Sequence, residues 1–361
     1  MKKTIQMAAV VAAVGLAAAA CGSKPVNNTS TSGSTNAATF KACMVTDTGG
    51  LDDHSFNSAA WQGMNEAKTE GAGKITIADA QSTTENDYAT NIAGFVSGGC
   101  GLIVTVGYSM DTATTTSATA HPSQKYAIVD NGSTGKNVKG LQFNTAQGAF
   151  LGGYVAAGMT KTGKVATFGG QNLPSVTVYM DGFWEGVQYY NKQHNTNVQV
   201  LGWNQTTQQG TFDPTNSFTD ENGGQQIAET FESQGADIVF PVAGGTGGGA
   251  LAAAQASHGA LKAIWVDTDG CQSYAQYCDI MLGTVTKGIA AAVSSTVEDA
   301  ANGTYSSSSY IGTLANNGTA WVPGTVLGST IPAALNAELA TIKTGIENGT
   351  IPITSKNQPT S

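Results

Sequence analysis

The 361-residue chain contains no arginine, and all 16 of its basic residues are lysines. Arginine is the side chain that usually grips carboxylates and phosphates, because its planar guanidinium makes two parallel hydrogen bonds. Its absence argues against amino acids, carboxylic acids and nucleotides as ligands and favours a neutral ligand with hydroxyl groups. The alternative is a compositional habit unrelated to any site. The net charge of −9 further argues against nucleic acid and anionic lipid head groups as partners.

The hydrophobic run at residues 7–20 is short for a membrane span and follows the basic pair Lys2 and Lys3. This pattern predicts a signal peptide over residues 1–20. Small residues, Ala18, Ala19 and Ala20, directly precede Cys21, as at the cleavage site of a bacterial lipoprotein, so we expect Cys21 to carry lipid. The alternative is an ordinary signal peptide followed by a chance cysteine. Residues 22–38 are rich in Ser, Thr, Asn and Gly, which predicts a disordered tether between a membrane anchor at Cys21 and a folded region outside the cytoplasm.

Four cysteines remain once Cys21 is set aside, and an even number in an exported chain indicates two disulfides. Cys271 and Cys278 are close in sequence, so we expect them to pair, which leaves Cys43 with Cys100. Four cysteines allow three pairings, and zinc binding is the other alternative. The sequence has no CxxC motif and its four histidines are scattered, so we predict no metal site.

From residue 40 onward, strand-like and helix-like segments alternate, which is typical of βαβ units and parallel sheets. The expected strands cover residues 41–46, 75–80, 101–106, 125–130, 164–169, 198–203, 236–242, 262–267 and 279–285. The expected helices include residues 59–67, 86–96, 146–159, 182–192, 224–234, 249–258 and 287–301. The predicted fold class is therefore α/β, with two parallel sheets flanked by helices.

The length suits two lobes rather than one. We expect the first lobe to span residues 39–148 and to be completed by about 286–322. The second spans 149–285 and is completed by about 323–354. A polar tail, which we expect to be frayed, follows at 355–361.

The segment from Gly49 to Asn57 connects the first expected strand to the first expected helix. In open α/β sheets ligands bind outside the carboxyl ends of the strands. Asp53, Ser55, Phe56 and Asn57 are therefore candidate ligand-binding residues. The alternative is helix capping by Asp53 or Ser55, with Phe56 as a packing residue.

Polar and aromatic residues also follow other expected strands. They are Asp47, Tyr108, Asp130, Trp203, residues 244–247 and Asp267. Capping is as good an interpretation as ligand contact for Asp47. Asp130 and Asp267 directly end apolar strands, where an unpartnered carboxylate would be costly, so a ligand role is favoured for both.

Seven motifs in this order resemble the basic membrane protein family of bacterial lipoproteins, substrate-binding proteins for purine nucleosides. They are GGLDDHSFN at residues 49–57, HPSQKYAIVD at 121–130, GAFLGGYVAA at 148–157, GFWEG at 182–186, AGGTG at 243–247, VDTD at 266–269 and TVTK at 284–287. The resemblance implies a two-lobed, hinged periplasmic-binding-protein fold of the first type. It also implies a monomer that closes on a nucleoside and delivers it to the permease of an ABC importer.

The same resemblance implies roles for individual residues. The base stacks on Phe56, Asp130 pairs with the purine edge, and Asp267 holds the ribose hydroxyls with help from Lys287. The remaining candidates that match family motifs are Gly244, Gly245 and Asp269. His54 and Gly270-Cys271 depart from the family pattern, so it is open whether Asp267 or Asp269 makes the ribose contacts. Candidates for a second stacking ring are Phe183, Trp184, Trp203 and Phe240, each of which could instead be core.

Other functions weighed against this one are binding of another neutral sugar or polyol, and nucleoside sensing without transport. A nucleoside hydrolase is disfavoured because the sequence has no GxSxG or HExxH motif. We therefore predict no catalytic residues and no cofactor.

Overall fold

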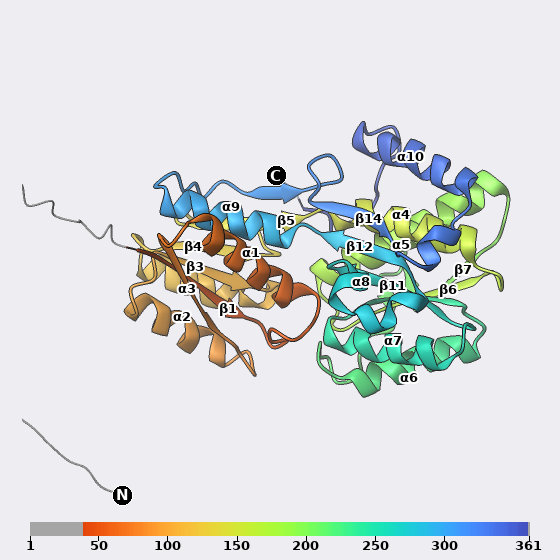
Figure 1. Ribbon diagram of the computed structural model, residues 1–361, viewed down its shortest axis with the longest axis horizontal. Helices are drawn as coiled ribbons and strands as arrows, with labels where there is room; N and C mark the ends of the chain where they lie inside the picture. The colour runs from red at the N-terminus through yellow and green to blue at the C-terminus, as the bar shows by residue number, and fades with distance from the viewer. Residues whose placement is uncertain (1–38, 360–361) are drawn as a thin grey trace, which may run out of the picture. The chain divides into compact units, whose positions relative to one another are not determined.

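The computed structural model describes residues 39–359 and contains two six-stranded sheets and a two-stranded ribbon (Figure 1). The expectations for the signal peptide, for Cys21 and for the tether lie outside the described residues. Among those residues, no helix combines the length and apolar character that crossing a membrane requires. The α/β class with parallel sheets flanked by helices is confirmed.

All strand pairs in the first sheet are parallel, in the order β13-β5-β4-β3-β1-β2. Its strands are β1 (Phe40–Thr46), β2 (Ile75–Ala80), β3 (Leu102–Val106), β4 (Lys125–Val129), β5 (Val138–Phe143) and β13 (Tyr310–Gly312). Its helices are α1 (Phe56–Glu70), α2 (Asp87–Ser97), α3 (Asp111–Ala120) and α9 (Ile289–Ala301), with the short 3₁₀ helix η1 (Tyr108–Met110).

The first sheet is buried on both faces, as the near-continuous apolar strands require. Met44 of β1 packs in the cluster that contains Met64 of α1 and Val293 of α9. Its neighbour Cys43 points the other way, into the cluster that contains Ile92 of α2. Alternate residues of one strand therefore serve two separate cores.

The second sheet has the order β14-β12-β11-β10-β6-β7, with β14 antiparallel to β12 and the other pairs parallel. Its strands are β6 (Lys164–Gly169), β7 (Gln199–Leu201), β10 (Ile238–Val242), β11 (Lys262–Asp267), β12 (Met281–Lys287) and β14 (Thr319–Pro323). The separate ribbon is β8 (Trp203–Asn204) with β9 (Gln209–Gly210).

Helices cover both faces of the second sheet as well: α4 and α5 lie together on one side and α6 and α7 on the other (Figure 1). Their bounds are α4 (Thr145–Met159), α5 (Pro174–His194), α6 (Glu221–Ser233) and α7 (Gly245–Ala256). The remaining helices are α8 (Gly270–Ser273), η2 (Ala275–Ile280), η3 (Leu327–Thr330) and α10 (Ala333–Glu347).

Within residues 39–359 the chain passes between the sheets three times. It crosses after β5 into α4, returns after β12 into α9, and crosses again between β13 and β14. The chain rejoins the second sheet at Thr319, where β14 begins. The expected lobe limits, 39–148 with 286–322 and 149–285 with 323–354, stay a prediction. The first sheet is therefore built from two stretches of chain that are far apart in sequence.

The start of the polar tail is anchored rather than frayed. Ser355 Oγ donates to the buried Asp181 carboxylate at 2.6 Å, and Asn144 Nδ2 donates to Gln358 Oε1 at 2.8 Å. Asn144 directly precedes α4, so the tail is tied to one of the three crossings. Hydrogen bonds to the buried residues Asp181 and Asn144 order this polar segment despite its lack of apolar residues.

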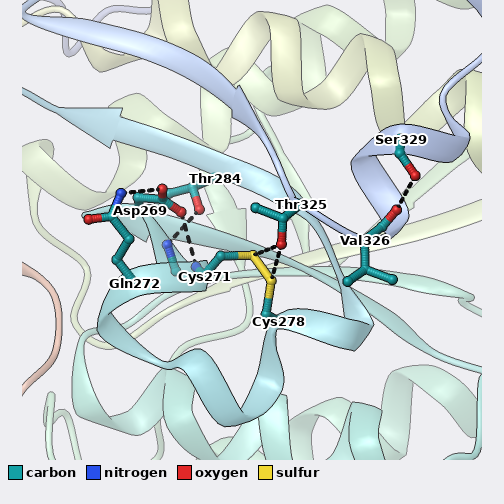
Figure 2. Close-up of a disulfide and its surroundings, with 9 residues drawn as sticks. Asp269, Cys271, Gln272, Cys278, Thr284, Thr325, Val326 and Ser329 are labelled. Atoms are coloured by element: carbon teal, nitrogen blue, oxygen red, sulfur yellow. Dashed lines mark hydrogen bonds between the residues drawn. A yellow bond between two sulfur atoms is a disulfide. The ribbon is translucent and has the colours of Figure 1, made fainter.

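The disulfides pair Cys43 with Cys100 and Cys271 with Cys278, as expected. Figure 2 shows the second bridge, which joins α8 to η2 in the chain that follows Asp267. The Thr325 hydroxyl contacts both sulfurs, at 3.0 Å from Cys278 Sγ and 3.7 Å from Cys271 Sγ. Asp269 caps α8 by accepting from the backbone N–H of Cys271 at 3.0 Å. The bridge and the cap together brace this loop.

Candidate functional site

A cavity that opens to solvent lies among the carboxyl ends of strands from both sheets. From the first sheet it receives residues after β1, β3 and β4, and from the second it receives residues at the ends of β10, β11 and β12. The candidate ligand residues that line it are Asp53, Phe56, Asn57, Asp130, Gly244, Asp267 and Lys287.

Asp53 organises the start of α1. Its Oδ1 accepts from the backbone N–H groups of Ser55 and Ser58, both at 3.0 Å, and its Oδ2 accepts from that of Asn57 at 2.6 Å. Burial raises the pKa of Asp53, and these hydrogen bonds oppose the rise. The capping interpretation is thus confirmed for Asp53. It is wrong for the Ser55 side chain, whose hydroxyl caps nothing and donates instead to Asp267.

Asp47, which directly follows β1, and Asn57, in the first turn of α1, are joined by a hydrogen bond and both carry side-chain oxygens that can accept hydrogen bonds. Asp47 Oδ1 accepts from Gly49 N at 2.9 Å and from Asn57 Nδ2 at 2.8 Å. Burial raises the pKa of Asp47 to about 6. The buried Oδ1 of Asn57 has no hydrogen-bond partner among the described residues. An unsatisfied buried acceptor is costly, so this position suits a hydroxyl or N–H group from a ligand.

Asp130 and Asp267 both have left-handed backbone conformations, with φ of 70° and 64°. Such angles are strained for residues other than glycine and concentrate at functional sites. Asp130 Oδ2 lies 2.6 Å from the Lys287 ammonium, in an ion pair that is almost fully buried. Burial raises the pKa of Asp130, and the Lys287 charge opposes the rise.

The Asp267 carboxylate holds one protein donor on each oxygen. Tyr179 donates its hydroxyl to Oδ1, and Ser55 donates its hydroxyl to Oδ2, each at 2.7 Å. Ser55 belongs to the first-sheet side of the cavity and Tyr179 to α5 on the second-sheet side. Asp267 is therefore a meeting point of the two halves.

Aromatic rings enter the cavity from both sides. Phe56 comes from α1, and Phe218 comes from the loop before α6. The start of α7 positions the Phe218 loop, because the backbone N–H of Thr246 donates to the Phe218 carbonyl at 3.0 Å. The Lys287 ammonium lies 4.8 Å from the Phe56 ring centre, within cation–π range. Three tyrosines also line the cavity: Tyr88, Tyr108 and Tyr179.

The candidates for a second stacking ring were wrong, since none of the four lines the cavity. Phe183 of α5 and Phe240 of β10 pack against each other in the core between the second sheet and its helices α4 and α5. The indole N–H of Trp203 donates to Asp181 at 3.0 Å, and Trp184 packs on the same core. Phe218 follows a polar loop and carries no sequence motif, so nothing in the sequence marked it as a cavity residue.

Three candidates lie outside the cavity lining: Ser55, whose hydroxyl donates to Asp267, and Gly245 and Asp269. Gly245 is the first residue of α7, behind Gly244. Asp269 borders a separate hollow with His54 and Gln272, and its carboxylate is engaged in capping α8. Of the two acids considered for the ribose, Asp267 is thus the one that faces the cavity, and the ligand roles of all these residues stay predictions.

The cavity is rich in acceptors and poor in positive charge. Among the described residues that line it, Lys287 is the one basic side chain, and it is paired with Asp130. Carboxylates that face each other repel anions, whereas they accept hydrogen bonds from hydroxyl and N–H groups. The arrangement can therefore hold a flat, uncharged molecule with several donors.

Comparison with known proteins places this chain among transport proteins. Residues 40–314 match the model of the Bmp family, described as ABC transporter substrate-binding protein PnrA-like. The chain is 33% identical over 277 residues to a CD4+ T-cell-stimulating antigen of Listeria innocua, covering 73% of this chain and 72% of the relative. It is 30% identical over 274 residues to the ABC transporter nucleoside-binding protein BmpA of Lactococcus lactis, covering 73% and 72%.

Solved structures resemble the fold. A solute-binding protein of an ABC transporter system from Aeropyrum pernix superposes with a TM-score of 0.75 at 23% identity, covering 89% of this chain and 94% of that one. Solute-binding proteins of this kind have two lobes, which agrees with the two sheets described above.

Proposed function

Because this chain belongs to the Bmp family of ABC transporter substrate-binding proteins, we propose that it captures purine nucleosides between its two sheets and delivers them to an ABC importer. The family role is non-enzymatic: the protein binds and hands over its ligand unchanged. The proposal that the ligand is a nucleoside draws on the name of the L. lactis relative. The choice of purines rests on the family resemblance, which implies that Asp130 pairs with the purine edge, and the cavity chemistry supports a flat base joined to a ribose.

The two phenylalanines support binding of a flat base. Phe56 and Phe218 both line the cavity, Phe56 from α1 on the first-sheet side and Phe218 from the loop before α6 on the second-sheet side. We expect the base to lie between these two rings. Stacking of a base on an aromatic side chain is worth roughly 1–3 kcal/mol. Asp130 can accept hydrogen bonds from the N–H groups on the edge of a purine once Lys287 releases it or shares it.

The buried acceptors support binding of a ribose. Asp267, Asp47 and the unpartnered Oδ1 of Asn57 all border the cavity, and a nucleoside carries three hydroxyl donors. The observation that carries the proposal is that two phenylalanine rings and several buried hydrogen-bond acceptors line the same cavity. A phosphate would bring negative charge among these acids, which favours nucleosides over nucleotides.

The setting of the protein follows from the same proposal. In this proposal the protein is a monomer outside the cytoplasm. The signal peptide at residues 1–20 directs its export, and lipid on Cys21 anchors it to the bacterial cell membrane. Residues 22–38 then serve as the tether that lets the folded region reach the permease.

Isothermal titration calorimetry with guanosine, inosine and ribose tests the proposed ligand. We expect the wild-type protein to bind a purine nucleoside more tightly than ribose. Phe56→Ala and Asp267→Ala should each weaken nucleoside binding by about 10- to 100-fold, since each removes on the order of 1–3 kcal/mol.

Asp52→Ala is the matched control, because Asp52 is exposed and does not line the cavity. Its affinity should equal that of the wild type. Tight binding of ribose without any nucleoside binding would instead identify a sugar-binding protein. Unchanged nucleoside affinity in both cavity variants would refute the assigned geometry.

A further inference from the structure

Tyr179 is a buried cavity residue that neither the sequence motifs nor the family comparison singled out. It lies on α5 with 1% of its surface exposed, and its ring packs edge-on against Phe240 at 6.1 Å between centres. Its hydroxyl donates to Asp267 Oδ1 at 2.7 Å. A phenylalanine would fill the same space, so the hydroxyl is the part whose role needs explaining.

The Tyr179 bond and the Ser55 bond reach Asp267 from different halves of the molecule. Tyr179 and Asp267 both belong to elements of the second sheet, so their contact does not depend on where the first sheet lies. Ser55 precedes α1 of the first sheet, so its bond to Oδ2 forms only when the two halves meet. Tyr179 can therefore hold Asp267 in place before a ligand arrives.

The two bonds also define what Asp267 can still accept. Each carboxylate oxygen has two acceptor positions, and Tyr179 and Ser55 occupy one on each. One position remains on each oxygen, and the two oxygens lie at the spacing of a single carboxylate. Two hydroxyls on adjacent carbons fit such a pair, with one hydroxyl donating to each oxygen.

The environment keeps the Tyr179 hydroxyl a donor. Burial, and then the nearby Asp267 charge, raise the pKa of the Tyr179 phenol well above its usual value, so it does not ionise near neutral pH. The left-handed backbone of Asp267 is strained and persists only if its surroundings hold it. A fixed donor on Oδ1 is one such restraint.

We propose that Tyr179 is a positioning residue that orients Asp267 toward a vicinal diol and so makes the site selective for ribonucleosides over deoxynucleosides. This inference rests on the proposed function, because it takes the ligand to be a nucleoside. It deepens that function by naming the residue that sets selectivity for the sugar.

Titrating wild type and Tyr179→Phe with guanosine, 2′-deoxyguanosine and 3′-deoxyguanosine tests the inference. The wild type should prefer guanosine over both deoxynucleosides. In the variant, guanosine affinity should fall about tenfold, as expected when a hydrogen bond to a charged group is lost. Affinity for the deoxynucleosides should fall less than about threefold, because they use only one of the two free positions, so the selectivity ratio shrinks.

Tyr189→Phe is the matched control, since Tyr189 lies on the same helix and does not line the cavity. Its selectivity ratio should equal that of the wild type. Ser55→Ala, which removes the donor on the other oxygen, should also lower the ratio. Thermal unfolding of each variant shows whether it is folded at the titration temperature.

The outcomes separate the two proposals. If the wild type binds no nucleoside, the proposed function fails and the role of Tyr179 fails with it. If the wild type binds guanosine but Tyr179→Phe leaves the selectivity ratio unchanged, or lowers all three affinities equally, only the inference about Tyr179 is overturned. A wild type that binds guanosine and deoxyguanosines equally overturns it as well.

Discussion

Asp47 is a residue whose protonation should affect stability in a measurable way. Burial raises its pKa from 3.8 to about 6, so between these pH values the folded protein binds a proton that the unfolded chain does not. The stabilisation is complete below about pH 4 and is lost as the pH rises through 6. A shift of about two units corresponds to at most about 3 kcal/mol.

Asp47→Asn should remove this contribution, so the difference in unfolding free energy between wild type and variant should change by up to about 3 kcal/mol from pH 4 to pH 7. Urea denaturation at several pH values measures it. Asp53 and Asp130, whose pKa values burial also raises, titrate in both proteins, and their charges also raise the pKa of Asp47, so the difference reports Asp47 together with this coupling. The same comparison for the exposed Asp52→Asn is the control. Parallel profiles for wild type and Asp47→Asn would contradict the expectation.

At the residue scale, the sequence predicted the acids better than the rings. Asp130 and Asp267 could be found because an acid at the end of an apolar strand stands out from its surroundings. Tyr179 and Phe218 could not, because an aromatic residue in a helix or a polar loop looks the same whether it faces core or cavity. Only the tertiary arrangement decides which.

At the element scale, the nine predicted strands are all present, and most helices lie where the pattern placed them. The strands β5, β9, β13 and β14 were not predicted. Of these, β5 contains Gly140, which breaks its apolar alternation. A Cβ at Gly140 would come within 2.4 Å of the Gly132 backbone, so the glycine is required by a close approach that the sequence does not reveal. The missed helix α3 is rich in threonine, which has low helix propensity, and it forms because tertiary packing overrides that preference.

The packing of α4 against α5 depends on the same kind of close approach. A Cβ at Gly186 of α5 would lie 2.0 Å from the Phe150 carbonyl oxygen of α4, which is impossible without moving a helix. We therefore expect Gly186→Ala to destabilise the protein by about 1–3 kcal/mol or more. Chemical denaturation followed by circular dichroism measures the loss.

Gly94→Ala is the matched control for this helix contact. Gly94 lies on α2, and a Cβ added there would have no atom of the described part of the chain within 4 Å, so an alanine side chain meets open space. Alanine is the better helix former, so this variant should gain roughly 0.5–1 kcal/mol. Equal effects of the two substitutions would show that helix propensity, and not the backbone contact, governs both sites.

At the scale of the whole molecule, the candidate site needs both halves at once. The Ser55–Asp267 bond and the bond from the Thr268 hydroxyl to the His54 carbonyl, at 2.8 Å, both join the chain before α1 to the end of β11. Binding of a nucleoside should therefore draw the halves together about the three crossings.

Small-angle X-ray scattering with and without guanosine measures this closure, and the radius of gyration should fall on addition of the ligand. Cytidine 5′-monophosphate is a suitable control, because its phosphate should be repelled by the acidic cavity and leave the scattering unchanged. Calorimetric binding of guanosine without any change in scattering would contradict closure.

The three crossings also bear on how the chain is made. The apolar face of the first sheet around Met44 is covered partly by α9, and the edge beside β5 is covered by β13, yet both elements are synthesised after nearly all of the second sheet. At roughly 5–20 residues per second, translation leaves that face and edge open for about ten seconds or longer. A fragment that ends near residue 148 lacks α9 and β13, so we expect its apolar face and its sheet edge to stay exposed.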